Sequence, residues 1–217
     1  MQKTTTYINK DTGESIVVDW SKQHPGIHRG LWRDVTVLMP EVAELIKNTF
    51  PEYSTWDGVD ESDLDKPALK FYYERQDFIW DIKVVMLMPG QWPCIPNWHY
   101  DLIPKDNKGK QDFTKVDPDW CMNMWMWISG PPLTMFRFCS RELGVELDPR
   151  RIDIDHEVVQ PETWYPFTQL DEHQGQPATE HGWRAFIRAT PPSLVLPSDN
   201  PLRRHSQVYL DAKNFKW

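Results

Sequence analysis

His99 and Asp101 stand two residues apart in the stretch Trp98-His99-Tyr100-Asp101, and together they could bind a metal ion. Residues i and i+2 of a β-strand point to the same face, so a strand here would place the imidazole and the carboxylate side by side. A nitrogen and a carboxylate oxygen in this arrangement are two of the three ligands of a facial iron site. The chain has seven histidines, so His-x-Asp also arises by chance, and the pair alone does not establish a metal site.

A second motif lies downstream, where His173 is followed by Arg184 with ten residues between them. A His-x-Asp pair, a distal histidine and an arginine at this spacing resemble the pattern of the Fe(II)/2-oxoglutarate-dependent dioxygenases. The resemblance covers roughly residues 78–190, rests on motifs alone and indicates no subfamily. It implies that Fe(II) is bound by His99, Asp101 and His173, and that Arg184 holds the far carboxylate of the cosubstrate 2-oxoglutarate.

The chemistry of these side chains agrees with that resemblance. Two neutral imidazoles and one carboxylate give a dication one face of ligands and leave three positions open for a substrate. This mixed set suits Fe(II) and tolerates Mn, Co, Ni or Zn. The guanidinium of Arg184 is a planar, permanently charged fork that matches a carboxylate through two parallel hydrogen bonds.

Two of these assignments have rivals. His181 is an alternative to His173 as the distal ligand, although only His173 has the ten-residue spacing to an arginine. Arg188 lies four residues after Arg184 and on the same face of a strand, which makes it the reserve ligand for the cosubstrate.

The segment 120–129 reads as a strand with two different faces, and one of them carries Asn123 and Trp125. If that face looks into a barrel, both residues approach the cosubstrate. If it looks outward, they pack under a helix. The sequence leaves both possibilities open.

Periodicity and turn signals predict an α+β chain that is mainly β. Pro40–Thr49 has the apolar spacing of a helix, and a second helix is expected within residues 63–76. From residue 78 the pattern becomes β, with strands expected near 78–88, 120–129, 133–138, 162–170 and 182–190, whereas residues 24–30 look like a loop. In the first of these strands one face is apolar, formed by Phe78, Trp80, Ile82, Val84, Met86 and Met88. The resemblance implies a double-stranded β-helix, or jelly roll of the cupin type, with the N-terminal helices packed on one sheet.

The length of 217 residues predicts a single domain, with an N-terminal arm and helices in 1–77, a β-helix core in 78–190 and a tail in 191–217. Three cysteines without CxxC spacing argue against a disulfide framework and favour the cytoplasm. No apolar leader or membrane-spanning run is visible. The net charge of −8 makes duplex nucleic acid a poor partner.

The functional prediction is therefore an Fe(II)- and 2-oxoglutarate-dependent oxygenase that hydroxylates a small molecule, a nucleotide or a protein residue. Two other classes stay open. One is a non-catalytic, cupin-like protein that binds a ligand. The other is a metal-dependent enzyme of the same fold that does not use 2-oxoglutarate.

Overall fold

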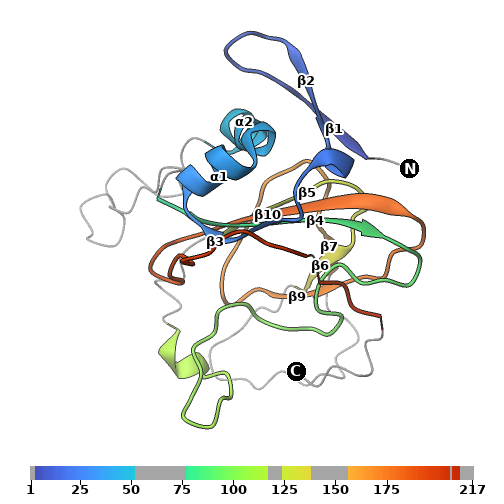
Figure 1. The fold of residues 1–217 in the computed structure, drawn as a ribbon. Coiled ribbons are helices and arrows are strands. Elements are labelled where there is room, and N and C mark those ends of the chain that lie inside the picture. Colours follow the sequence, from blue (N-terminus) through green and yellow to red (C-terminus); the bar gives the residue numbers. More distant parts are fainter. Residues whose placement is uncertain (1–2, 52–76, 117–123, 138–155, 206, 211–217) are drawn as a thin grey trace, which may run out of the picture.

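Two antiparallel sheets form the body of the protein in the computed structural model, which describes residues 3–51, 77–116, 124–137, 156–205 and 207–210 (Figure 1). The larger sheet has five strands in the order β3 (Gly26–Gly30), β4 (Ile79–Leu87), β10 (Gly182–Thr190), β5 (Met124–Ile128) and β8 (Tyr165–Phe167). The smaller sheet has three, in the order β7 (His156–Val158), β6 (Thr134–Arg137) and β9 (Glu172–Gly175). A separate hairpin pairs β1 (Thr4–Ile8) with β2 (Ser15–Asp19).

Two helices cover the outer face of the five-stranded sheet: α1 (Trp32–Leu38) and α2 (Pro40–Thr49) (Figure 1). The predicted bounds of α2 are confirmed, because Pro40 occupies its first turn and one apolar face is buried. That face meets the even-numbered side chains of β4, of which Trp80, Ile82 and Val84 belong to the same core cluster. Among the described residues the protein is thus mainly β, with helices over one sheet, as the sequence predicted.

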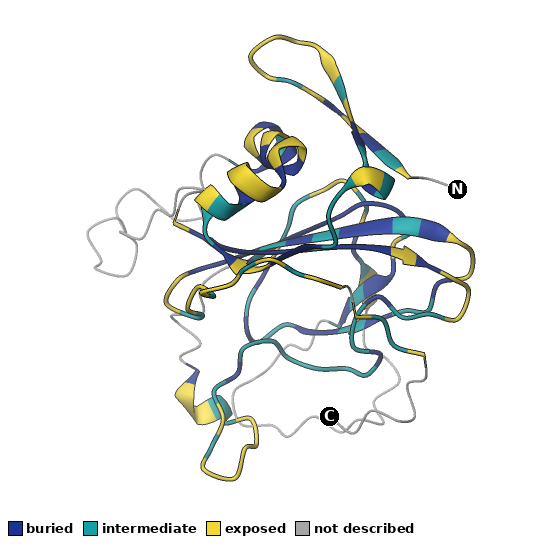
Figure 2. Cartoon of the chain, viewed as in Figure 1, coloured by how far each residue is buried: buried dark blue, intermediate teal, exposed yellow. Residues whose placement is uncertain are grey.

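The predicted apolar face of β4 is shorter than the sequence suggested. Val84 is 4% exposed, whereas Met86 is 40% exposed and Met88 is exposed as well. The end of the strand runs beyond the helices that cover its beginning (Figure 2). Alternation continues there in the sequence, but neither α1 nor α2 lies over it to bury the side chains (Figure 2).

A second apolar cluster joins the two sheets. Met124, Met126 and Ile128 of β5 pack in it with Phe136 of β6 and Phe167 of β8. The inner faces of both sheets therefore look at one another, and side chains on those faces are the ones that can meet in a shared cavity.

The prediction of a loop at residues 24–30 was wrong, because this segment forms strand β3 at the edge of the large sheet. The backbone of Gly26 has a φ of +130°, and a Cβ there would lie 1.9 Å from the carbonyl oxygen of Ile82. The glycine that suggested a turn thus permits close strand pairing.

Some expectations lie outside the described residues, including the helix within 63–76 and the beginning of the strand at 120–129. Within the described residues, no helix combines the length and the apolar character that crossing a membrane requires.

Candidate metal centre and its cavity

His99 and His173 are brought together by backbone pairing. The segment before Asp101 runs antiparallel beside β9, and the two histidines form a β-bridge with N–H···O distances of 2.9 and 3.0 Å. The amide of Gly175 donates to the carbonyl of Ile95 at 2.8 Å and extends this pairing. The two imidazole rings consequently lie with their centroids 4.3 Å apart.

Asp101 completes the cluster, although the regular strand expected at His-x-Asp does not form. After His99 the chain bends away from β9, and Leu102 adopts a φ of +58°. The Asp101 carboxylate still lies 3.9 Å from Nε2 of His99 and 3.6 Å from Nε2 of His173. One donor atom from each of the three residues lies within 4.8 Å of the other two.

Hydrogen bonds at the far side of each ring orient both histidines as ligands. Nδ1 of His99 lies 2.8 Å from the carbonyl of Asn97, and Nδ1 of His173 lies 3.1 Å from the carbonyl of Asp171. A carbonyl only accepts, so each Nδ1 is a protonated nitrogen, and in the neutral ring the lone pair is therefore on Nε2. Burial, together with His173, lowers the pKa of His99 to about 4, which keeps this ring neutral near pH 7.

The donor set fits a first-row dication. Two imidazole nitrogens and a carboxylate lie close together, and their lone pairs repel one another. A cation bound between them would stabilise this arrangement. Ligands about 2.1 Å from one ion lie about 3 Å apart when they are at right angles. Closing the gaps of 3.6 and 3.9 Å between Asp101 and the two imidazoles to that separation requires a movement of less than about 1 Å. The gap between the two imidazole nitrogens, at most 4.8 Å, requires less than about 2 Å.

Arg188, the reserve cosubstrate ligand of the sequence prediction, has its guanidinium occupied by two carboxylates. Nη1 donates to Asp101, and Nη2 donates to Asp81 at 3.0 Å. Burial opposes ionisation of Asp101, but the charge of Arg188 outweighs it and holds the pKa of that carboxyl well below its usual range. Arg188 therefore positions the carboxylate of the candidate metal ligand Asp101.

Arg184 differs from Arg188 in having no carboxylate partner among the described residues. It lies in β10 and is only 2% exposed. Nη2 donates to the hydroxyl of Thr134 at 2.7 Å, while Nε is buried without a hydrogen-bond partner. Burial lowers its pKa, and an anion bound beside it would reverse that effect.

A cavity of about 240 Å³ connects the metal cluster with Arg184. Its walls come from both sheets, from the segment that precedes Asp101 and from the C-terminal segment. Among the residues that line it are Cys94, Ile95, Thr134 and Phe186. This volume is below the roughly 300–1,000 Å³ of pockets for drug-sized ligands, so the cavity suits a small dicarboxylate.

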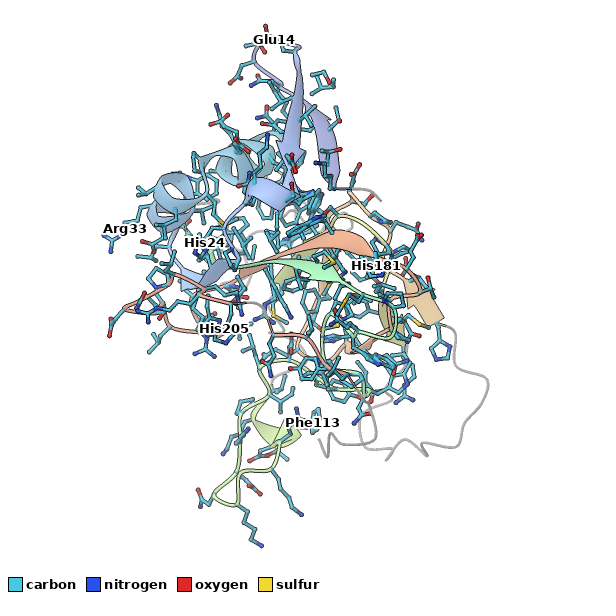
Figure 3. The ribbon with its side chains drawn as sticks, turned by 45° about the vertical axis from the view of Figure 1, so that its right-hand side comes forward. Glu14, His24, Arg33, Phe113, His181 and His205 are labelled. Carbon is cyan, nitrogen blue, oxygen red and sulfur yellow. The ribbon has the colours of Figure 1, made fainter. Side chains whose placement is uncertain are left out.

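The other predicted site residues lie elsewhere. His181 is exposed in the turn before β10, so of the two candidate distal ligands only His173 lies with His99 and Asp101 (Figure 3). Trp125 does not contact the cavity, because it lies on the helix side of the sheet with its ring centroid 6.0 Å from that of Phe50. Asn123 lies outside the described residues.

Sequence reasoning missed Asp81 and Thr134, which support Arg188 and Arg184 respectively. Both face the space between the sheets. Asp81 left one signal in the sequence, since it is a carboxylate on a strand whose other residues, apart from Lys83, are apolar. A polar residue in such a strand needs a buried partner.

Neither a comparison with protein families nor a comparison with curated proteins finds a match for this chain.

Proposed function

We propose that this protein is an Fe(II)- and 2-oxoglutarate-dependent oxygenase built on a double-stranded β-helix. Arg184 carries the proposal, because it is a buried guanidinium without a carboxylate partner among the described residues and it faces the same cavity as the histidine and aspartate cluster. A metal alone would explain the cluster. An anionic ligand accounts for the arginine as well.

The two packed antiparallel sheets, with helices over one of them, support the β-helix part of the proposal. In that fold, residues on the inner faces of both sheets meet at one centre. His173 comes from the small sheet and Arg184 from the large one, which fits a site between the sheets.

His99, Asp101 and His173 would hold the iron, which supplies activation of oxygen for oxidation of a C–H bond. Arg184 binds the far carboxylate of 2-oxoglutarate, and Thr134 orients the guanidinium through its hydroxyl. Ile95 and Phe186 exclude water from the space between the anchor and the metal ligands. Arg188 fixes the carboxylate of Asp101. The prime substrate is a small molecule, a nucleotide or a protein residue.

The decisive experiment is a calorimetric titration of 2-oxoglutarate into the anaerobic Fe(II) protein or its Mn(II) form. Arg184→Ala should weaken cosubstrate binding by about tenfold or more, since it removes a charge-assisted bidentate pair from a desolvated pocket. Metal affinity should stay nearly unchanged. Arg184→Lys should recover only part of the loss, because an ammonium cannot make two parallel hydrogen bonds.

Arg33→Ala is the matched control, since Arg33 is exposed on α1 (Figure 3). Failure of the wild-type protein to bind 2-oxoglutarate at millimolar concentration would rule out the oxygenase. If the protein binds metal but not 2-oxoglutarate, the result favours a metal-dependent enzyme of another kind. If it binds neither, the result favours a ligand-binding barrel without catalytic activity. Succinate formation upon addition of oxygen separates an active enzyme from a protein that only binds the cosubstrate.

A further inference from the structure

The cavity holds more positive charge than the metal site and the cosubstrate account for. Among its described lining residues are four cations, Lys83, Arg184, Arg188 and Arg203, against the carboxylates of Asp81 and Asp101. The whole chain, by contrast, has a net charge of −8. The cavity therefore has an excess of cations although the chain as a whole is acidic.

The arrangement follows from strand alternation. Asp81, Lys83 and Val85 share one face of β4, and Arg184, Phe186 and Arg188 lie opposite them on β10. Arg188 pairs with Asp81, whereas Lys83 lies opposite an aromatic ring. The inner face of the sheet thus has an ion pair at one end, an arginine at the other and a lysine between them.

Lys83 has no carboxylate partner within the described part of the chain. Its ammonium donates to the backbone carbonyls of Pro93, at 2.7 Å, and of Gln207. Burial, with the nearby charges of Arg203 and Arg184, lowers its pKa to about 8. A nearby anion would favour the charged form of this lysine.

Arg203 lies at the outer end of the cavity. Its side chain is 22% exposed and stands beside His28, whose side chain is 51% exposed. Its nearest carboxylate, Asp81, is 3.7 Å away and already accepts from Arg188 and His28 at 3.0 and 2.8 Å. Asp81 is therefore shared among several cations and compensates Arg203 only in part.

We infer that the prime substrate carries an acidic group, either a carboxylate or a phosphate, and that this group binds Arg203 at the outer end of the cavity next to Lys83. The inference rests on the proposed function. The metal dication and the 2-oxoglutarate dianion cancel one another, so their binding leaves the excess of cations in place. A second anion reduces it.

The test uses the full chain loaded with Mn(II) and saturating 2-oxoglutarate, so that Arg184 is already occupied. Methyl phosphate and acetate are titrated separately by calorimetry as probes of the two acid classes. One of them should bind with one equivalent per chain, and the tighter probe identifies the class of the acidic group. Arg203→Gln should weaken that binding by about tenfold or more, because the charged fork is lost.

Arg204→Gln is the matched control, since Arg204 is the neighbouring residue, is exposed and does not line the cavity. It should bind the probe like the wild type. Arg203→Lys keeps the charge without the fork and should show intermediate affinity. This variant also serves as the test if Arg203→Gln does not fold.

Three results would overturn the inference. They are binding of neither probe by the loaded wild type, equal binding by wild type and Arg203→Gln, and displacement of 2-oxoglutarate by the probe. Displacement would place the anion at Arg184 and leave the oxygenase proposal intact. Conversely, binding that depends on Arg203 in a protein that never binds 2-oxoglutarate would support the anion site and reject the oxygenase.

Discussion

Arg188 joins the candidate metal centre to the five-stranded sheet, because its guanidinium contacts Asp101 at one end and Asp81 at the other. Such a buried arginine between two acids is costly to remove, since both carboxylates lose their partner together. At the scale of single residues, this makes Arg188 a support for the metal ligand, and it leaves Arg184 as the residue open to the cosubstrate.

Arg188→Gln should therefore lower the free energy of unfolding by about 3–5 kcal/mol and weaken Mn(II) binding by about tenfold. Arg188→Lys should recover part of both, because it restores one charge. Urea denaturation and metal titration measure the two effects. If Arg188→Gln keeps wild-type metal affinity, Asp101 does not need this arginine to act as a ligand.

The buried imidazole of His99 should make the free energy of unfolding depend on pH. Its pKa is about 4 in the folded protein, against an ordinary value of 6.5, so between these values the unfolded chain binds a proton that the folded chain does not. Stability should thus fall as pH decreases through this window, by about 2 kcal/mol between pH 7 and pH 5.

Urea denaturation of the metal-free protein at both pH values measures this loss. In His99→Gln the same interval should cost about 2 kcal/mol less, since glutamine has no proton to gain. An identical pH dependence in the variant would show that His99 is not buried in its neutral form.

Strand β4 is the element on which both sides of the protein depend. Its even-numbered residues pack under the helices, and its odd-numbered residues Asp81 and Lys83 line the cavity. A shift of register by one residue would exchange these two sets. The core under the helices therefore also fixes the direction in which the cavity residues point.

Val84→Asp and Met86→Asp test that arrangement as a matched pair on one strand face. Val84→Asp should cost several kcal/mol, because it buries an unpaired charge at a position that is 4% exposed. Met86→Asp should change stability by less than about 1 kcal/mol, because this position is 40% exposed. Thermal unfolding compares them, and equal losses would mean that the end of β4 is buried.

The site is a product of the whole molecule, because its parts come from distant segments. His99 lies in the segment beside β9, His173 in β9 itself and Arg188 in β10. A metal ion bound to His99, Asp101 and His173 would link β9 to the segment that pairs beside it. It should accordingly stabilise the folded state against unfolding.

At a free Mn(II) concentration about 100 times its dissociation constant, the stabilisation should be about 2.7 kcal/mol. For a chain of this size that corresponds to a rise in melting temperature of roughly 5–10 °C. Scanning calorimetry should show the rise in the wild type and in His205→Ala, whose histidine is exposed (Figure 3). It should be lost in His99→Ala and His173→Ala, and a rise retained in both would exclude the assigned ligands.

The sequence by itself predicted the helix α2, two long strands and the candidate ligand residues. Alternating apolar residues predicted β4 and β10, Pro40 and its apolar spacing predicted α2, and the motif spacing selected His99, Asp101 and His173. These signals are local, since each depends on residues a few positions apart on one strand or helix. The tertiary structure decided the electrostatic partners.

Arg188 meets carboxylates 87 and 107 residues away in the sequence, and Arg184 meets a hydroxyl 50 residues away. The tertiary structure also decided that Trp125 faces the helices and that β4 is uncovered at Met86. Pairing across a sheet and coverage by a helix depend on which segments become neighbours, and residue spacing within one segment carries no such information.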